Sequence, residues 1–207
     1  MIGSRPLVRC RRGSTAAEFT MVLPLLLILI FGIIDGGRYM WTVNQSQKAV
    51  QAGARFAVVT NTVPGGLQEY SFVSETNPPG SPIPAGAFGS ITCEESGGTA
   101  VCSCTANPCS DDMVGTADTD AFDAIANRMR NIYPDLVNEN VTIRYEGVGL
   151  GFAGNPHGSD VSALVTVEMT GAMFRPITLL VFGGPQISLP AFRSSMTLED
   201  GLGTVSN

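Results

Sequence analysis

The sequence predicts an α+β fold in which a long N-terminal transmembrane helix continues into a small head with an antiparallel sheet. Three observations carry this prediction. Residues 19–34 form an uncharged apolar run, apolar positions continue at helical spacing to about residue 59, and short alternating segments follow in the C-terminal half. A small sheet packed on a long helix satisfies all three patterns.

The charge distribution orients the predicted helix. The 207 residues include 12 Lys or Arg and 18 Asp or Glu, which gives a net charge of −6. The first 13 residues hold four arginines and no acid, whereas the remainder holds 8 basic and 18 acidic residues. A basic leader (1–13), an apolar run and an acidic body predict a single-pass protein of a bacterial inner membrane, with a cytoplasmic N-terminus and a periplasmic head. The acidic balance argues against a nucleic-acid partner.

The apolar run is long enough for a membrane anchor. Phe19–Ile34 contains sixteen uncharged residues, which span roughly 24 Å as a helix, and the residues before it extend this length toward the ~30 Å hydrocarbon core. The main alternative is a cleaved secretory signal. The run ends in Asp35-Gly36-Gly37-Arg38 without a small-x-small cleavage site, and this favours a retained anchor.

Several short motifs around this run resemble the N-terminal region of TadE-like proteins, which are pseudopilins of the tight-adherence (Tad, type IVc) pilus system. The resemblance covers residues 11–59. It rests on Gly13 with a Glu-aromatic pair five residues later, a Leu-Pro inside the apolar run, and the small-residue stretch Gly53-Ala54-Arg55-Phe56-Ala57. The exit Asp35-Gly36-Gly37-Arg38 departs mildly from the family's usual Glu-Phe-Gly-Arg.

The resemblance implies processing and assembly roles for particular positions. Prepilin peptidase would cut between Gly13 and Ser14, so that Glu18 becomes the fifth residue of the mature chain. In pilins, this glutamate is thought to pair with the N-terminal amine of a neighbouring subunit, and such pairing makes two charges tolerable in lipid. Phe19 belongs to the same motif. The alternative is a chance glycine near an ordinary signal anchor.

The helix is expected to run from residue 14 to residue 60, with a transmembrane part at 14–35 and a periplasmic extension at 36–60. Pro24 is expected to kink it. Gly32 and Gly36 form a small-xxx-small pair that permits close helix packing, although glycine is common in membrane helices. Beyond the membrane, one apolar stripe is available for packing on neighbouring subunits or on the head. It comprises Met40, Val43, Gln47, Val50, Ala54, Ala57 and Val58.

The predicted head occupies residues 61–207 and begins with a Pro- and Gly-rich segment, 61–120, that reads as a loop. Four cysteines lie within it, at Cys93, Cys102, Cys104 and Cys109. An even number in an oxidising compartment predicts two disulfides that staple a loop at 90–110. Two connectivities stay open: 93–102 with 104–109, or 93–104 with 102–109. Zinc is the alternative, but the spacing does not match the usual knuckles.

The rest of the head reads as one helix and several strands. Asp120 is the expected N-cap of a helix at 121–133. The alternative for the acids around it is a calcium site, although they lack the ligand order of an EF-hand. Strands are expected at 141–145, 161–169, 187–189 and 194–198. The apolar segment 178–182 is too short for a second span and is a buried strand, a short helix or a contact patch. His157 lies in a predicted turn, where we expect its side chain to face solvent and not to act in catalysis.

Together these features predict a minor pseudopilin with a pilin-like head, acting in pilus biogenesis, adhesion or secretion. We expect no enzymatic activity, no cofactor and no metal. The expected partners are prepilin peptidase, other pilins or pseudopilins, the inner-membrane assembly platform and membrane lipid. The alternatives are an uncleaved bitopic scaffold and a periplasmic binding or adhesive module.

Overall fold

The computed structural model describes residues 12–155 and 159–199. The leader residues 1–11 and the turn residue His157 lie outside the described residues, so the expectations for them stay predictions. The chain divides into two compact units. The anchor unit comprises Met1–Thr42 with Phe174–Ile187, and the head unit comprises Val43–Met173 with Ser188–Asn207.

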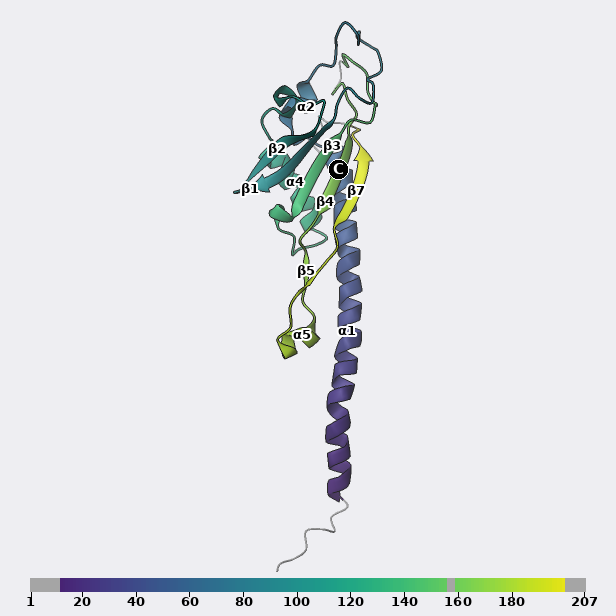
Figure 1. The fold of residues 1–207 in the computed structure, drawn as a ribbon, viewed down its shortest axis with the longest axis vertical. Helices are drawn as coiled ribbons and strands as arrows, with labels where there is room; N and C mark the ends of the chain where they lie inside the picture. Colours follow the sequence, from purple (N-terminus) through teal and green to yellow (C-terminus); the bar gives the residue numbers. More distant parts are fainter. Residues whose placement is uncertain (1–11, 156–158, 200–207) are drawn as a thin grey trace, which may run out of the picture. The chain divides into compact units, whose positions relative to one another are not determined.

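The N-terminal helix α1 runs without interruption over Arg12–Ala57, a length of 46 residues (Figure 1). Pro24 lies inside it, and the helix continues on both sides of this residue. Its N-terminal part belongs to the anchor unit and its C-terminal part to the head unit. The structure therefore confirms the predicted long helix, and the kink at Pro24 stays a prediction.

Five antiparallel strands form the sheet of the head unit in the order β2–β1–β3–β4–β7. The antiparallel sheet predicted from the sequence is thereby confirmed. The strands are β1 (Ser90–Ser96), β2 (Thr99–Ala106), β3 (Val141–Glu146), β4 (Leu164–Met169) and β7 (Phe192–Thr197). Burial alternates along β3 and β4, so one face of the sheet faces the core.

The core of the head unit lies between that face and the two helices that cover it. α4 (Thr119–Arg130) buries Phe122, Ile125 and Met129. A Cβ atom at Gly53 of α1 would lie 2.7 Å from Met129 Cγ and 3.3 Å from Val167 Cγ1. The absence of a side chain at Gly53 therefore lets α1 pack closely on both α4 and β4.

The buried stripe of α1 differs in part from the predicted one. Val50, Ala54, Ala57 and Val58 are buried as expected, and Ala49 joins them. Two predicted members, Met40 and Gln47, are instead exposed. The buried stripe of the head unit therefore lies around Gly53, where α1 packs directly on α4 and β4.

The expectation of a loop at 90–110 is wrong, because residues 90–106 form the hairpin of β1 and β2. Gly97 and Gly98 connect the two strands with φ angles of 63° and 86°. Glycine adopts this left-handed conformation at little cost, and two such residues make the turn that suits a hairpin. Short helices flank the hairpin at α2 (Gly65–Glu69) and α3 (Asp111–Val114).

The predicted helix near residue 121 exists, but its N-cap is Asp118 and not Asp120. The Asp118 carboxylate accepts a hydrogen bond of 2.9 Å from the backbone N–H of Ala121. Asp120 lies exposed in the first turn, where its charge still favours the helix N-terminus. After α4, the 3-10 helix η2 (Asn138–Asn140) leads into β3.

The apolar segment near residue 180 is a short helix, which is one of the three forms considered for it. α5 (Ile177–Phe182) lies between β5 (Met173–Phe174) and β6 (Ile187–Ser188), and these two strands form a separate two-stranded sheet. We refer to residues 174–187 as the excursion, since they belong to the anchor unit and not to the head unit.

Candidate functional site

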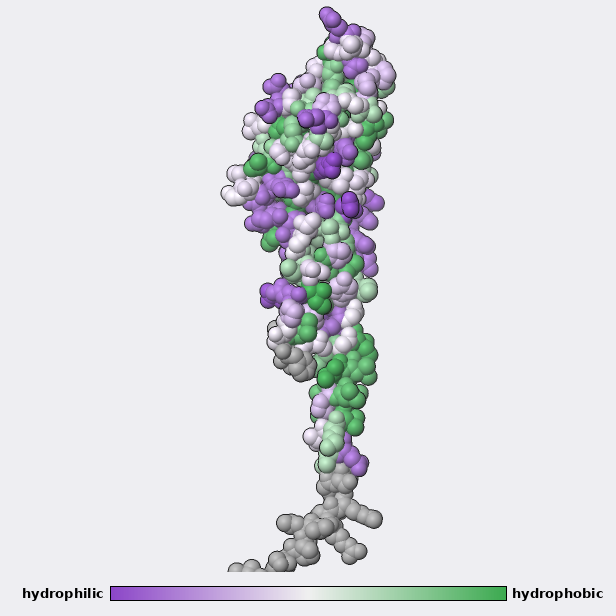
Figure 2. Space-filling model, in the orientation of Figure 1, coloured by the Kyte–Doolittle hydropathy of each residue, from purple (hydrophilic) through white to green (hydrophobic). Residues whose placement is uncertain are grey.

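The N-terminal part of α1 presents large apolar side chains that no protein core covers. From Ala16 onward, α1 is long and apolar enough to cross a membrane, and the most apolar window is not buried within the chain. Phe19 is 64% exposed and Met21 is 82% exposed. Figure 2 colours much of this stretch as hydrophobic. Exposure of so continuous an apolar surface fits a lipid environment.

The predicted processing site lies in the first turns of α1. Helical backbone begins at Arg12, so the bond between Gly13 and Ser14 lies one residue inside the helix. Glu18 and Phe19 follow one turn later, and both are exposed. The structure leaves the processing and pairing roles of these residues as predictions.

The two glycines of the small-xxx-small pair lie open on α1. Apart from the neighbouring backbone of α1 itself, no described atom lies within 4 Å of a Cβ built at Gly32 or Gly36. Their surface is therefore accessible to a second helix, which the pair would allow to approach closely.

A carboxylate immediately beyond the apolar run makes the most specific contact of the anchor unit. Asp35 is 7% exposed although it follows directly on Ile34. Its oxygens accept hydrogen bonds from the backbone N–H of Ile177 (2.8 Å), the backbone N–H of Thr178 (2.8 Å) and the Thr178 hydroxyl (2.7 Å). α1 thus supplies the capping carboxylate for the first turn of α5, which has no side-chain cap of its own.

Aromatic and cationic groups complete this cluster, which we call the Asp35 cluster. Arg38 Nη1 lies 3.3 Å from Asp35 Oδ1 and 3.4 Å from the carbonyl oxygen of Arg175. The Arg38 guanidinium also lies 5.5 Å from the centre of the Phe174 ring, and Tyr39 meets the same ring edge-on at 5.5 Å. These contacts attach both the start of α5 and its preceding strand to α1.

The Asp35 cluster was not predicted from the sequence. Asp35 appeared only as part of the exit motif, and α5 appeared only as an apolar segment. The available signal was a carboxylate directly after a long apolar run, where buried hydrogen-bond donors would stabilise it. The sequence could not indicate which donors, because they lie 142 and 143 residues away.

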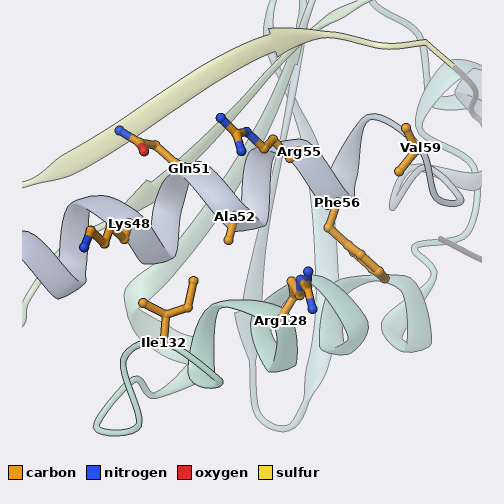
Figure 3. A pocket seen from close by; sticks show the side chains of 8 residues that line it. All are labelled: Lys48, Gln51, Ala52, Arg55, Phe56, Val59, Arg128 and Ile132. Atoms are coloured by element: carbon orange, nitrogen blue, oxygen red, sulfur yellow. The ribbon is translucent and has the colours of Figure 1, made fainter. Parts of the chain in front are cut away.

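A groove on the head unit, with a volume of about 440 Å³, lies between α1 and α4 (Figure 3). Ala52 and Phe56 point from α1 toward α4, and Ile132 points back from the α4 side. Three cations also line the groove, at Lys48, Arg55 and Arg128. The other lining residues are Gln51 and Val59, so no acid is present among the described residues that line it. Its apolar floor and cationic edge suit an acidic protein surface.

The four head cysteines form two disulfides, Cys93–Cys102 and Cys104–Cys109. This is one of the two connectivities left open by the sequence. Cys93 is fully buried and faces its partner across the β1–β2 hairpin, whereas Cys104 is exposed. The first bond therefore joins the two strands of the hairpin, whereas the second joins β2 to the segment that follows it.

Metal binding finds no site in the described part of the chain. No group of three or more His, Cys, Asp or Glu side chains lies together in a ligand arrangement among those residues. Two of the clustered acids have structural partners instead. Asp118 caps α4, and Asp123 accepts a 2.8 Å hydrogen bond from the Asn138 amide.

Comparison with protein families decides the relationship of the N-terminal segment. The family model described as TadE-like protein matches residues 13–55. This segment is TadE-like. The match begins at Gly13 and ends at Arg55, within the range where the motifs resemble the family, and so confirms that resemblance. No curated protein and no solved structure matched the chain. The TadE-like match supports involvement in Tad pilus assembly.

Proposed function

We propose that this protein is a minor pseudopilin of a Tad-type pilus, held in the inner membrane with its head in the periplasm. The observation that carries the proposal is the coincidence of the TadE-like match with a helix whose apolar surface is exposed. The matched residues include the Gly13 junction, Glu18 and the open glycines Gly32 and Gly36. Assembly would use lateral packing of α1 between subunits.

Prepilin peptidase is the proposed processing enzyme, with the cut between Gly13 and Ser14. Glycine lowers the stability of a helix interior by about 1 kcal/mol relative to alanine, so the first turn of α1 can unwind at modest cost for the enzyme. Cleavage creates an amine at Ser14, four residues before Glu18. The proposed partner of the Glu18 carboxylate is this amine on a neighbouring subunit.

The groove of the head unit supplies a second proposed packing surface. The sequence beyond residue 13 has a net charge of −10, yet Lys48, Arg55 and Arg128 all line one groove. Electrostatic complementarity then favours an acidic face of a neighbouring pilin-type subunit as the partner. This surface lies on α1 beyond the membrane part, so helix packing and head packing would act together.

Intact-mass spectrometry of the membrane-extracted protein tests the proposal. The expected mass is that of a chain beginning at Ser14, and Gly13→Ala should shift most of the protein to full length. Gly32→Ala is the matched control, because its Cβ meets open space and it lies away from the cut. A full-length wild-type chain, in cells with an active peptidase, would instead identify an uncleaved bitopic scaffold.

The adhesive alternative requires a test that leaves the sheet intact. Deletion of residues 90–110 would remove β1 and β2 and so disrupt the head. Val101→Lys changes one exposed position on the edge strand β2 instead. Loss of surface attachment with normal pilus number would favour an adhesive module, and unchanged attachment would favour the assembly role.

A further inference from the structure

The excursion has the composition of a membrane-contacting segment. Residues 173–188 read MFRPITLLVFGGPQIS and contain one charged side chain, that of Arg175. Five of the six residues of α5 are apolar, and Met173 and Ile187 are exposed on the flanking strands. A six-residue helix is roughly 9 Å long, so this segment is far too short to span a bilayer.

The contacts of Asp35 place α5 at the end of the membrane-spanning run. Asp35 directly follows Ile34, the last residue of that run, and its carboxylate bonds the first two N–H groups of α5. α5 therefore begins beside the end of the apolar run of α1. The three accepted hydrogen bonds and the nearby Arg38 make a carboxylate tolerable at this depth.

The residues around this level match those that mark a membrane interface. Tyr39 and Trp41 follow Asp35 on α1, and Trp41 is exposed. Arg38 and Arg175 are exposed cations at the neck of the excursion. Aromatic side chains gather at the headgroup level of membranes, and arginine side chains reach lipid phosphates from there.

We propose that the excursion is a second membrane contact, in which α5 lies within the outer leaflet beside α1 and Arg175 meets the phosphates. The partner is the phospholipid bilayer. The exposed apolar run of α1 ends at Ile34, one residue before the carboxylate that holds the start of α5, and this adjacency identifies the occupant. Interfacial helices bury an apolar face roughly 5–10 Å into the headgroup boundary. The proposal depends on α1 spanning a bilayer and is independent of leader cleavage.

A single-tryptophan series in the full chain tests this proposal. In a Trp41→Phe background, Leu179→Trp places the probe on α5 and Ile187→Trp places a second probe at its base. Leu27→Trp on the span is the positive control, and Val101→Trp on the head is the negative control. Each variant is reconstituted into phosphatidylethanolamine–phosphatidylglycerol vesicles whose acyl chains are brominated both near the headgroup and near the chain ends, so that probes at either depth meet a quencher.

The expected result is that bromolipid lowers the Leu179→Trp emission by at least about half of the loss seen for Leu27→Trp. The Ile187→Trp emission should fall by less. The proposal is overturned if bromolipid quenches neither excursion probe more than it quenches Val101→Trp. Quenching by acrylamide would then show that the excursion faces water, and protection from acrylamide would show that a second subunit covers it. The proposal is also overturned if Leu27→Trp itself escapes quenching, because α1 would then not span the bilayer.

Discussion

The two parts of α1 carry different apolar side chains, although they belong to one continuous helix. In the anchor unit its apolar side chains are large and exposed, as at Phe19 and Met21. In the head unit they are small and buried, as at Ala49, Ala54 and Ala57. Helix geometry is the same in both, so the difference lies in what surrounds the helix.

The size of the side chains reflects the environment of each part of the helix. Lipid adapts its shape to any side chain, and large apolar groups gain the most from leaving water. A protein core has a fixed shape, and small residues let α1 approach α4 and β4 closely, as at Gly53. Exposure and residue size together therefore distinguish a lipid-facing part of a helix from a core-facing part.

A matched pair of substitutions tests this distinction most strongly. Val50 is 2% exposed in the head core and Val22 is 58% exposed on the span. Val50→Asp should destabilise the head by about 4 kcal/mol, because a carboxylate would be buried without partners. Val22→Asp should leave the head stability unchanged and weaken membrane insertion. Hydrogen exchange of the β3 and β4 amides measures the first effect, and the membrane-bound fraction measures the second.

Equal loss of β3 and β4 protection in the two variants would contradict the distinction. It would mean that the span also supports the folding of the head.

The disulfides should contribute unequally within the head. Cys93→Ala with Cys102→Ala should cost about 2–3 kcal/mol of unfolding free energy, since the bond restrains the unfolded hairpin and Cys93 is buried. The Cys104–Cys109 bond closes a shorter loop, so replacing both of its cysteines by alanine should cost less, about 2 kcal/mol. Urea denaturation of the oxidised proteins measures both values.

Accessibility provides the independent check on this order. Mild reductant followed by alkylation should label Cys104 before Cys93, because only Cys104 is exposed. Simultaneous labelling of all four cysteines would show that the hairpin and the segment after it open as one unit.

Substitutions in the Asp35 cluster should affect the anchor unit and leave the head unit unchanged. Asp35→Ala removes the acceptor for three hydrogen bonds at the start of α5 and should release the excursion. Chymotrypsin should then cut the segment from Phe174 to Phe182 roughly tenfold faster in detergent-extracted protein. Asp35→Asn is the control, because its single carbonyl oxygen retains part of the bonding and should give an intermediate rate.

An unchanged cleavage rate in Asp35→Ala would show that Phe174 and its ring contacts suffice to hold the excursion. A simultaneous loss of head protection would show that the effect is not local.

The smallest effect concerns the buried tyrosine of β3. Tyr145 is fully buried, and its hydroxyl oxygen accepts a 3.1 Å hydrogen bond from the Val63 N–H. Burial raises the pKa of Tyr145 above its ordinary value of about 10. The unfolded chain therefore loses this proton first, so the stabilisation is complete below pH ~10 and falls as the pH rises further.

Tyr145→Phe should cost about 1 kcal/mol at neutral pH, because Val63 loses its acceptor, and should weaken the alkaline decline. Urea midpoints at neutral pH and above pH ~10 measure both effects. An equally steep alkaline decline in the variant would assign it to other groups.

The sequence predicted those elements whose pattern is local. The apolar run and helical spacing predicted α1, and clean alternation predicted β3 at the correct residues. The hairpin at 90–106 was missed because β2 is an edge strand with little burial to produce alternation. The pair Gly97-Gly98 carried the missing signal.

Other features could not be decided from residue type and local spacing alone. The N-cap of α4 was misplaced by two residues, because Asp118 and Asp120 are equally suitable by type. The disulfide connectivity stayed ambiguous until the hairpin register placed Cys93 opposite Cys102. The groove needs α1 and α4 side by side, so no spacing within either helix could indicate it.

The long sequence separation between Asp35 and its hydrogen-bond donors has a consequence for biosynthesis. Asp35 emerges 142 residues before Ile177, which at ~5–20 residues per second is roughly 7–30 seconds of translation. During that interval Arg38, which follows three residues later on α1, can pair with the carboxylate, but the three hydrogen bonds from α5 are replaced by water. A carboxylate held only by water and one exposed arginine resists entry into hydrocarbon, so in the proposed membrane orientation Asp35 would keep α1 from moving deeper until α5 has been made.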